Sequence, residues 1–292
     1  MARLLALFAA TSAMQPASRR AALQSLSGAV VATLPQRAAA DVFAGCPVVP
    51  RALVVNTEDV AATAAFLREA IGMEIYTLNG ATLAAFGPTG TITPKDFVPG
   101  VSSLDVDAGH FSLELRAATG VAPPDVERDR VLYVQLALPN QFRASRIMRY
   151  GGELRDGYGA WSVGAPGGLP LRLLVGDEPR DRVMYVAYRC LNVKKSVAFY
   201  EANGFRKKPY PRARPVQRVE SVFDPDPPKG AVYLEACAER FGILLVPFRQ
   251  KRAPPPGTPA VGALRVASAD AAGSVVDPDG NLLERTDGGV FW

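Results

Sequence analysis

Side chains that commonly bind metals or act as nucleophiles are few in this chain. Its one histidine is His110, and its three cysteines are Cys46, Cys190 and Cys237. The cysteines form no Cys-x-x-Cys pair and have no histidine at zinc-ligand spacing, so the sequence excludes a thiolate zinc centre. Either one disulfide with a free thiol or three buried thiols would account for them. We expect His110 to be a partly exposed loop residue at the start of a strand.

The chain also lacks the motifs of several other chemistries. It has no glycine-rich phosphate loop, no serine nucleophile motif and no dinucleotide fingerprint. A basic cluster, "RKKPYPRARPVQR", spans residues 206–218. This cluster favours either an acidic partner, such as a glutathione-like carboxylate, or a strand edge that Lys and Pro protect from aggregation. We expect the strand edge.

The positive charge of the chain is concentrated at its N-terminus. The sequence has 33 Lys and Arg against 28 Asp and Glu. Four arginines lie in the first forty residues, which contain no acidic residue: Arg3, Arg19, Arg20 and Arg37. The rest of the chain is close to neutral, so its composition indicates no nucleic-acid partner.

Residues 1–40 resemble a bipartite targeting segment. "MARLLALFAATSA" is typical of a secretory signal, with an arginine, an apolar run and small residues at its end. The pair Arg19–Arg20, a mildly apolar stretch and the three alanines before Asp41 are similar to a twin-arginine signal for the thylakoid lumen. Neither apolar stretch reaches the roughly 18–20 residues of a spanning helix. We therefore predict a cleaved plastid signal, a lumenal protein and no membrane span.

Two segments of the chain predict the same helix. They are "DVAATAAFLREAIGM", residues 59–73, and "NVKKSVAFYEANGF", residues 192–205. Each begins at a short polar residue, Asp59 or Asn192, whose oxygen can cap the free N–H groups of the first turn. Each then carries an apolar stripe at helical spacing and closes at the glycine next to its last residue, where φ can be positive.

Strand-forming segments surround both helices and appear again after each copy. The order is strand, helix and about three strands, so the chain reads as four βαβββ-type modules in series, the fourth too short for a helix. The predicted fold class is α+β, with the modules paired into two domains, 47–177 and 182–287. "DPDG", residues 277–280, is a tight turn that connects the last two strands.

The segments Asn192–Phe205 and Asp277–Glu284 resemble the vicinal oxygen chelate superfamily. Within it, the chain is most similar to the two-domain glyoxalase I-like proteins of plants and algae, over residues 50–287. The resemblance implies curved, cup-shaped mixed sheets with helices outside and a site inside each cup. It also implies a divalent metal of the nickel, zinc or magnesium type, which polarises two adjacent substrate oxygens while a proton moves between neighbouring carbons.

Part of the implied ligand set is present. In that superfamily the metal is held by His, Gln or Glu from the first strand of a module and by Glu from its last strand. The resemblance assigns Glu114, in "HFSLELR", and Glu284, in "DPDGNLLERT", as metal ligands, and Glu284 as the catalytic base. Glu114 can alternatively be an ordinary strand carboxylate that faces solvent or pairs with a nearby cation.

The other implied ligand positions carry unsuitable residues. The first strands place Ala52, Tyr133 and Tyr185 there, and tyrosine rarely coordinates at neutral pH because its pKa is about 10. The last strands of the second and third modules place Arg172 and Leu244 there. Tyr133, Arg172 and Tyr185 are therefore candidate residues for binding a substrate or an anion, with packing of the sheet as the alternative, and the metal set as a whole is eroded.

Three functions follow from these observations. The first is lactoylglutathione lyase-type chemistry on α-oxoaldehyde–thiol adducts, which would detoxify methylglyoxal. The second is non-catalytic binding of a small ligand, such as a glutathione adduct. The third is an assembly role in the thylakoid lumen. The fold alone does not choose among them.

Overall fold

The computed structural model describes most of the chain after the predicted targeting segment. The described ranges are 48–78, 80–87, 110–122, 129–138, 144–156, 161–175, 182–211, 227–236, 241–248, 257–268 and 272–287. Residues 1–40, Cys46, Cys237 and the basic cluster beyond position 211 lie outside them. In the described ranges, no helix has the length and apolar character needed to cross a membrane.

The described ranges contain three α-helices, two of them in the segments that the sequence analysis predicts as helices. They are α3 (Val60–Phe66), which continues as the π-helical turn η1 (Leu67–Ile71), α4 (Ala144–Arg149) and α5 (Val193–Ala202). Oδ1 of Asp59 accepts the Ala62 N–H at 2.8 Å, and Oδ1 of Asn192 accepts the Lys195 N–H at 3.1 Å. Both predicted N-caps are therefore confirmed. Gly72 ends the first helix at φ 90°, as the predicted positive φ requires.

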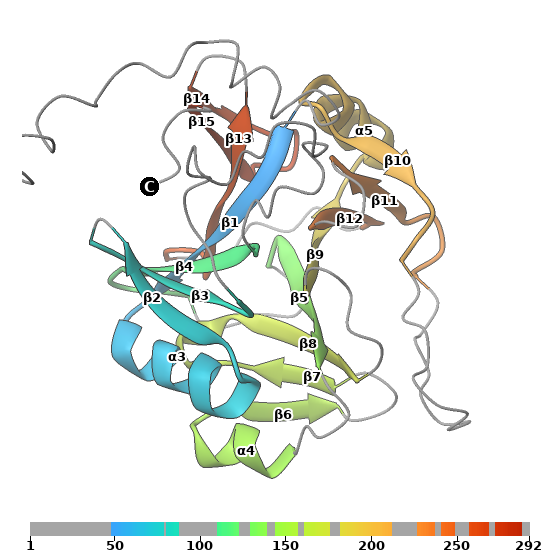
Figure 1. Ribbon diagram of the computed structural model, residues 1–292. Coiled ribbons are helices and arrows are strands. Elements are labelled where there is room, and N and C mark those ends of the chain that lie inside the picture. The colour runs from blue at the N-terminus through green and yellow to red at the C-terminus, as the bar shows by residue number, and fades with distance from the viewer. Residues whose placement is uncertain are drawn as a thin grey trace, which may run out of the picture. The chain divides into compact units, whose positions relative to one another are not determined.

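The strands form two mixed sheets (Figure 1). A seven-stranded sheet has the order β14-β15-β13-β1-β4-β3-β2, and an eight-stranded sheet has the order β10-β11-β12-β9-β5-β8-β7-β6. The strands of the seven-stranded sheet are β1 (Val48–Thr57), β2 (Glu74–Leu78), β3 (Ala81–Ala85), β4 (Ser112–Ala117), β13 (Val261–Ser268), β14 (Gly273–Val276) and β15 (Leu282–Asp287). Those of the eight-stranded sheet are β5 (Val131–Leu138), β6 (Glu153–Asp156), β7 (Trp161–Gly164), β8 (Pro170–Val175), β9 (Val183–Cys190), β10 (Arg206–Lys208), β11 (Val232–Glu235) and β12 (Gly242–Pro247). The α+β class and the cup-like sheets are confirmed.

The pairing of the modules differs from the order along the chain. β1 of the first module pairs antiparallel with β13 of the fourth, while β5 of the second pairs antiparallel with β9 of the third. Figure 1 shows the blue strand β1 beside the red strand β13. Each sheet therefore combines strands from both segments 47–177 and 182–287, instead of one sheet per segment as we expected. The modules of the seven-stranded sheet are the two that lie farthest apart in sequence.

One apolar cluster joins the helices and both sheets. Alternate strand residues belong to it, such as Leu113 on β4 and Leu264 on β13, together with Phe66 from the first helix. Phe111, just before β4, stacks on Phe241, just before β12, with ring centroids 3.7 Å apart. Because side chains alternate along a strand, the residues between these core positions point to the opposite face of each sheet. We call that opposite face the cup face.

The tight turn "DPDG" attaches the fourth module to the helix of the third. Oδ1 of Asp277 accepts the backbone N–H groups of Asp279 and Asn281 at 2.9 and 2.7 Å. Oδ2 of Asp277 accepts the Tyr200 hydroxyl of α5 at 3.0 Å and the Asn281 side-chain amide at 2.9 Å. Asp279 accepts the Ser196 hydroxyl of α5 at 2.6 Å. The most recognisable motif of the sequence therefore has a structural role here.

The basic cluster begins on an edge strand. Arg206–Lys208 form β10, which ends the eight-stranded sheet and is exposed throughout. β10 pairs with β11 on its other side. Positive charge on the open side of such a strand disfavours edge-to-edge association. The expectation of a charged strand edge is confirmed for these residues.

Candidate functional site

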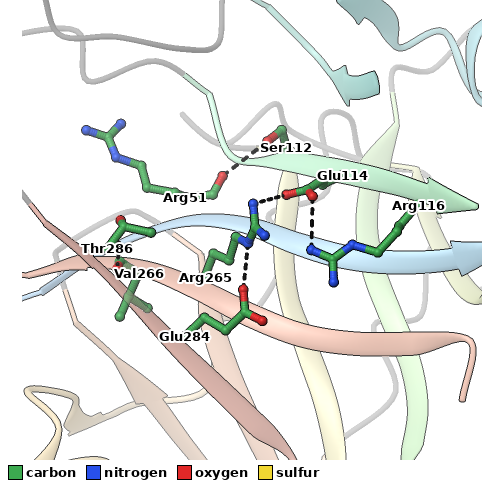
Figure 2. Close-up of polar contacts among 8 residues, drawn as sticks. All are labelled: Arg51, Ser112, Glu114, Arg116, Arg265, Val266, Glu284 and Thr286. Atoms are coloured by element: carbon green, nitrogen blue, oxygen red, sulfur yellow. Dashed lines mark hydrogen bonds and ion pairs between the residues drawn. The ribbon is translucent and has the colours of Figure 1, made fainter. Parts of the chain in front are cut away.

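Two predicted metal ligands of the seven-stranded cup lie on either side of one arginine. Nη1 of Arg265 donates to Oε2 of Glu114 at 2.5 Å, and Nε of Arg265 donates to Oε2 of Glu284 at 2.7 Å. Figure 2 shows the Arg265 guanidinium between the two carboxylates. The structure thus brings Glu114 and Glu284, which we expected in the separate domains 47–177 and 182–287, into one cup and places a protein cation between them.

The sheet register explains how one side chain reaches both carboxylates. Arg265 on β13 is the register partner of Glu284 on the neighbouring strand β15. Glu114 on β4 lies two strands away in the other direction, roughly 10 Å at about 4.8 Å per strand. The strand between them is β1, where Ala52 is the partner of Arg265 and Val54 is the partner of Glu114. The small side chain of Ala52 leaves space for the arginine to extend across β1.

This group of charges is largely removed from water. The side chains of Arg265, Glu114 and Glu284 are 19%, 7% and 22% exposed. Glu114 also accepts from Nη2 of Arg116 at 3.3 Å, which adds a second cation at the outer end of the group. A buried carboxylate requires a partner of opposite charge, and here the chain supplies it. The alternative interpretation of Glu114, as a carboxylate paired with a nearby cation, is confirmed.

These residues do not fit a divalent metal site. Nickel, zinc and magnesium sites use several oxygen, nitrogen or sulfur donors around one point. In the described ranges, no three His, Cys, Asp or Glu side chains gather in one place. The first-strand position of the first module is Ala52, which has no donor atom, and the guanidinium of Arg265 adds positive charge between the two remaining carboxylates. A cation would have to displace that guanidinium.

Sequence reasoning did not identify Arg265. The signal was available, because Arg265 is the one charged residue in the apolar strand segment "VGALRV". It stands two residues from Ala263, and residues two apart on a strand share a face. A charge inside a buried strand requires a partner, so the alternation marked Arg265 as a cup-face cation, whereas its match with Glu114 depended on the pairing of the modules.

The predicted substrate-binding residues gather on the cup face of the eight-stranded sheet. Nη1 of Arg172, on β8, donates to the Tyr133 hydroxyl, on β5, at 2.8 Å, and the guanidinium carbon lies 4.9 Å from the centre of the Tyr133 ring. The Tyr133 and Tyr185 rings meet edge to face with centroids 6.2 Å apart. Tyr133, Arg172 and Tyr185 therefore form one site, and their role in binding stays a prediction.

Further tyrosines extend this site. The hydroxyls of Tyr185 and Tyr210 are 2.7 Å apart, and the Tyr185 hydroxyl donates to Oε1 of Gln135 at 3.4 Å. Tyr233 packs edge to face against Tyr185 at 5.9 Å, and Leu244 joins the same apolar cluster. The expected metal-ligand positions of this cup are thus occupied by Tyr133, Tyr185 and Leu244, which form an aromatic and apolar layer with phenol oxygens, and by the guanidinium of Arg172.

Burial determines the charge states in this cup. It raises the pKa of Tyr185 and of Tyr233 far above the ordinary phenol value, and neighbouring tyrosine oxygens raise the pKa of Tyr185 further. Burial lowers the pKa of Arg172, but the oxygens of Tyr133, Tyr185 and Tyr210 outweigh it, so the net shift is upward. The site therefore presents neutral phenols around a permanent cation.

The guanidinium of Arg172 in this cup is incompletely satisfied. Nη2 of Arg172 is buried and has no hydrogen-bond partner among the residues that the structure describes. A buried N–H group of an ion without an acceptor costs free energy, on the order of 1–3 kcal/mol or more. An oxygen acceptor that entered the cup would recover that free energy.

The remaining candidate residues play no part in either cup. His110 precedes β4 and is partly exposed, as predicted. Cys190 is a free, buried thiol, and burial raises its pKa well above the usual range, with Asp279 adding to the effect. A neutral thiol of this kind is unreactive. A disulfide that joins Cys46 and Cys237 would lie outside the described residues.

Comparison with known proteins supports the fold. No protein-family model matches the chain, and no curated protein sequence matches it. Among solved structures, glyoxalase I from Zea mays matches with a TM-score of 0.59 at 17% identity, covering 85% of this chain and 95% of that one. A point mutant of the same maize enzyme matches with a TM-score of 0.60 at 17% identity, covering 87% and 97%.

A second solved protein has the same architecture. A putative dioxygenase from Bacillus subtilis subsp. subtilis str. 168 matches with a TM-score of 0.51 at 10% identity, covering 81% of this chain and 84% of that one. At identities this low, the structural similarity establishes a shared fold only. The chemistry has to be argued from the residues of each site. The chain therefore has the fold of glyoxalase I, with four modules in two cup-shaped sheets.

Proposed function

We propose that the chain is a glyoxalase-fold protein that binds a small carboxylate-containing molecule in the cup of the eight-stranded sheet. The observation that carries the proposal is Arg172, a permanent cation with a buried nitrogen that has no hydrogen-bond partner among the described residues. Guanidinium groups bind carboxylates through two N–H groups at once, and Nη2 provides one such group here.

The surroundings of Arg172 suit an organic anion. Tyr133 and Tyr185 supply aromatic surface near the cation, and Tyr233 extends this surface by packing against Tyr185. Ligand sites typically combine an apolar lining with a few polar groups that orient the ligand. A molecule with a carboxylate and an apolar or thioether portion matches both parts, and a glutathione adduct belongs to that class.

Lactoylglutathione lyase-type chemistry on α-oxoaldehyde–thiol adducts is the competing proposal, and the shared fold is what favours it. That chemistry uses a divalent metal to polarise neighbouring oxygens of the substrate. The donor sets do not fit such an ion, because Glu114 and Glu284 are both bound to Arg265 and the other cup presents Tyr133 and Arg172. The residues thus favour binding over catalysis.

The experiment compares ligands and variants by thermal unfolding and titration calorimetry. Lactate and S-lactoylglutathione test the carboxylate, and lactamide is the neutral control. We expect the carboxylates to raise the Tm of the wild type and of Arg68→Met, which removes an exposed arginine. They should leave the Tm of Arg172→Met unchanged, and Arg172→Lys should show intermediate binding.

Two results would decide against this function. Equal stabilisation of wild type and Arg172→Met by lactate would place binding elsewhere, and no response to any carboxylate would remove the proposal. Turnover of the hemithioacetal of methylglyoxal and glutathione, abolished by Glu284→Gln, would instead establish the lyase.

We also propose that the protein works in the plastid, in the thylakoid lumen, from the composition of residues 1–40. The expected mature N-terminus is Asp41, which N-terminal sequencing of the native protein would test. An assembly role in the lumen predicts co-migration with thylakoid complexes, whereas a ligand-binding protein would be recovered free in lumen extracts.

A further inference from the structure

We propose that Arg265 is a built-in cation that replaces a divalent metal in the seven-stranded cup, and that Glu114 and Glu284 form a latent cation site which removal of the guanidinium exposes. Arg265 belongs to the seven-stranded sheet and Arg172 to the eight-stranded sheet, so this proposal does not depend on ligand binding at Arg172. It rests on the contacts of the three side chains and on the small residues around them.

The positive charge of Arg265 lies between two carboxylates of different modules. Two nitrogens of one guanidinium, Nη1 and Nε, each bind a different carboxylate, at 2.5 and 2.7 Å. The carboxylates belong to β4 and β15, strands of the first and fourth modules, so the guanidinium links the two modules across β1 and β13. A metal ion between the same oxygens would make the same link.

The charges of this group of side chains balance. Glu114 and Glu284 bring two negative charges, and Arg265 and Arg116 bring two positive charges. Without Arg265, two largely buried carboxylates would face each other with one exposed arginine as counter-ion. Like charges at close range repel strongly where water is excluded, and a divalent cation carries the charge that relieves this repulsion.

Small residues lie next to Arg265 on the cup face. The register partner of Arg265 on β1 is Ala52, and the neighbouring cup-face residue on β13 is Ala263; both are buried and have only a methyl side chain. Replacing arginine by alanine at position 265 would therefore open room for an ion and its water ligands. Hard divalent cations bind through carboxylates and water in this way. The chain thus retains two donor carboxylates, Glu114 and Glu284, and the guanidinium of Arg265 fills the space that an ion would need.

The test loads purified proteins with Mn²⁺, Co²⁺, Ni²⁺ or Zn²⁺, removes free metal and measures bound metal by elemental analysis together with Tm. Wild type should bind no stoichiometric metal in this cup and show no metal-dependent Tm. Arg265→Ala and Arg265→His should bind about one ion per chain, and their Tm should rise with metal and fall with chelator. Adding Glu284→Gln to either variant should abolish the response.

A second measurement identifies the guanidinium itself. Free guanidinium at low millimolar concentration should raise the Tm of Arg265→Ala and compete with metal binding, because it can occupy the vacated place. It should not raise the Tm of wild type. If Arg265→Ala folds poorly, Arg265→Gln provides a neutral polar variant for the same measurements.

Two results would contradict this proposal, and neither depends on the proposal for Arg172. Stoichiometric metal in wild type that depends on Glu284 would show that Arg265 does not take the place of the ion. Folded Arg265→Ala and Arg265→His that bind no metal would refute the latent site. Failure of the carboxylate-binding proposal for Arg172 would leave both of these results unchanged.

Discussion

The hydrogen bond between Tyr200 and Asp277 offers a quantitative test of how the fourth module is held. The two side chains are buried, with the residues 2% and 4% exposed, and the hydroxyl donates at 3.0 Å. Tyr200→Phe removes the hydroxyl and keeps the ring, which packs against Phe199 and Phe205 at 5.1 and 5.8 Å. The change therefore isolates one hydrogen bond to a buried carboxylate.

A hydrogen bond to a charged group contributes about 1.5–3 kcal/mol. We expect Tyr200→Phe to lower the free energy of unfolding by that amount. Asp277→Asn should cost more, because all four groups that Asp277 accepts from are donors and an amide NH2 would face some of them. In the double variant, the two losses should fall short of additivity by about 1–3 kcal/mol.

Urea denaturation of the two single variants and the double variant measures these values. Tyr188→Phe is the matched control, since Tyr188 is buried but its hydroxyl makes no hydrogen bond among the described residues. Hydrogen exchange should also show faster opening of β14 and β15 in Tyr200→Phe. A loss below about 0.5 kcal/mol, or one equal to that of Tyr188→Phe, would refute the reasoning.

Two further predictions concern the charges and the phenols. Arg265→Met should lower the free energy of unfolding by about 3–5 kcal/mol, because it leaves two carboxylates without their shared partner; chemical denaturation checks this, and an unchanged midpoint would contradict it. Burial raises the pKa of four buried tyrosines far above the ordinary phenol value, so their protons are retained in the folded state and lost on unfolding above about pH 10. Stability should therefore fall as pH rises above that value, by about 1.4 kcal/mol per pH unit for each of these tyrosines, and the part of the tyrosinate absorbance that belongs to these four should appear together with unfolding, not before it. The tyrosines are Tyr185, Tyr188, Tyr200 and Tyr233.

The local elements of this protein were predictable from short stretches of sequence. Asp59 and Asn192 begin their helices because their side chains accept N–H groups three residues on. Gly72 ends the first helix because the chain needs a positive φ there. The alternation of "SLELRA" and "LLERTD" placed Glu114 and Glu284 on cup faces, since the side-chain period of a strand is two. Each of these interactions spans a few residues, so the sequence nearby suffices to specify it.

The tertiary structure decided which elements meet. The four modules have similar first strands, β1, β5, β9 and β13, so periodicity does not tell whether β1 pairs with a strand of the second module or of the fourth. That choice depends on burying both sheets in one core, a sum of many distant contacts. With β1 beside β13, Arg265 comes within reach of Glu114, 151 residues away in sequence. The sequence alone placed these two carboxylates on cup faces, and the module pairing determined that a guanidinium lies between them.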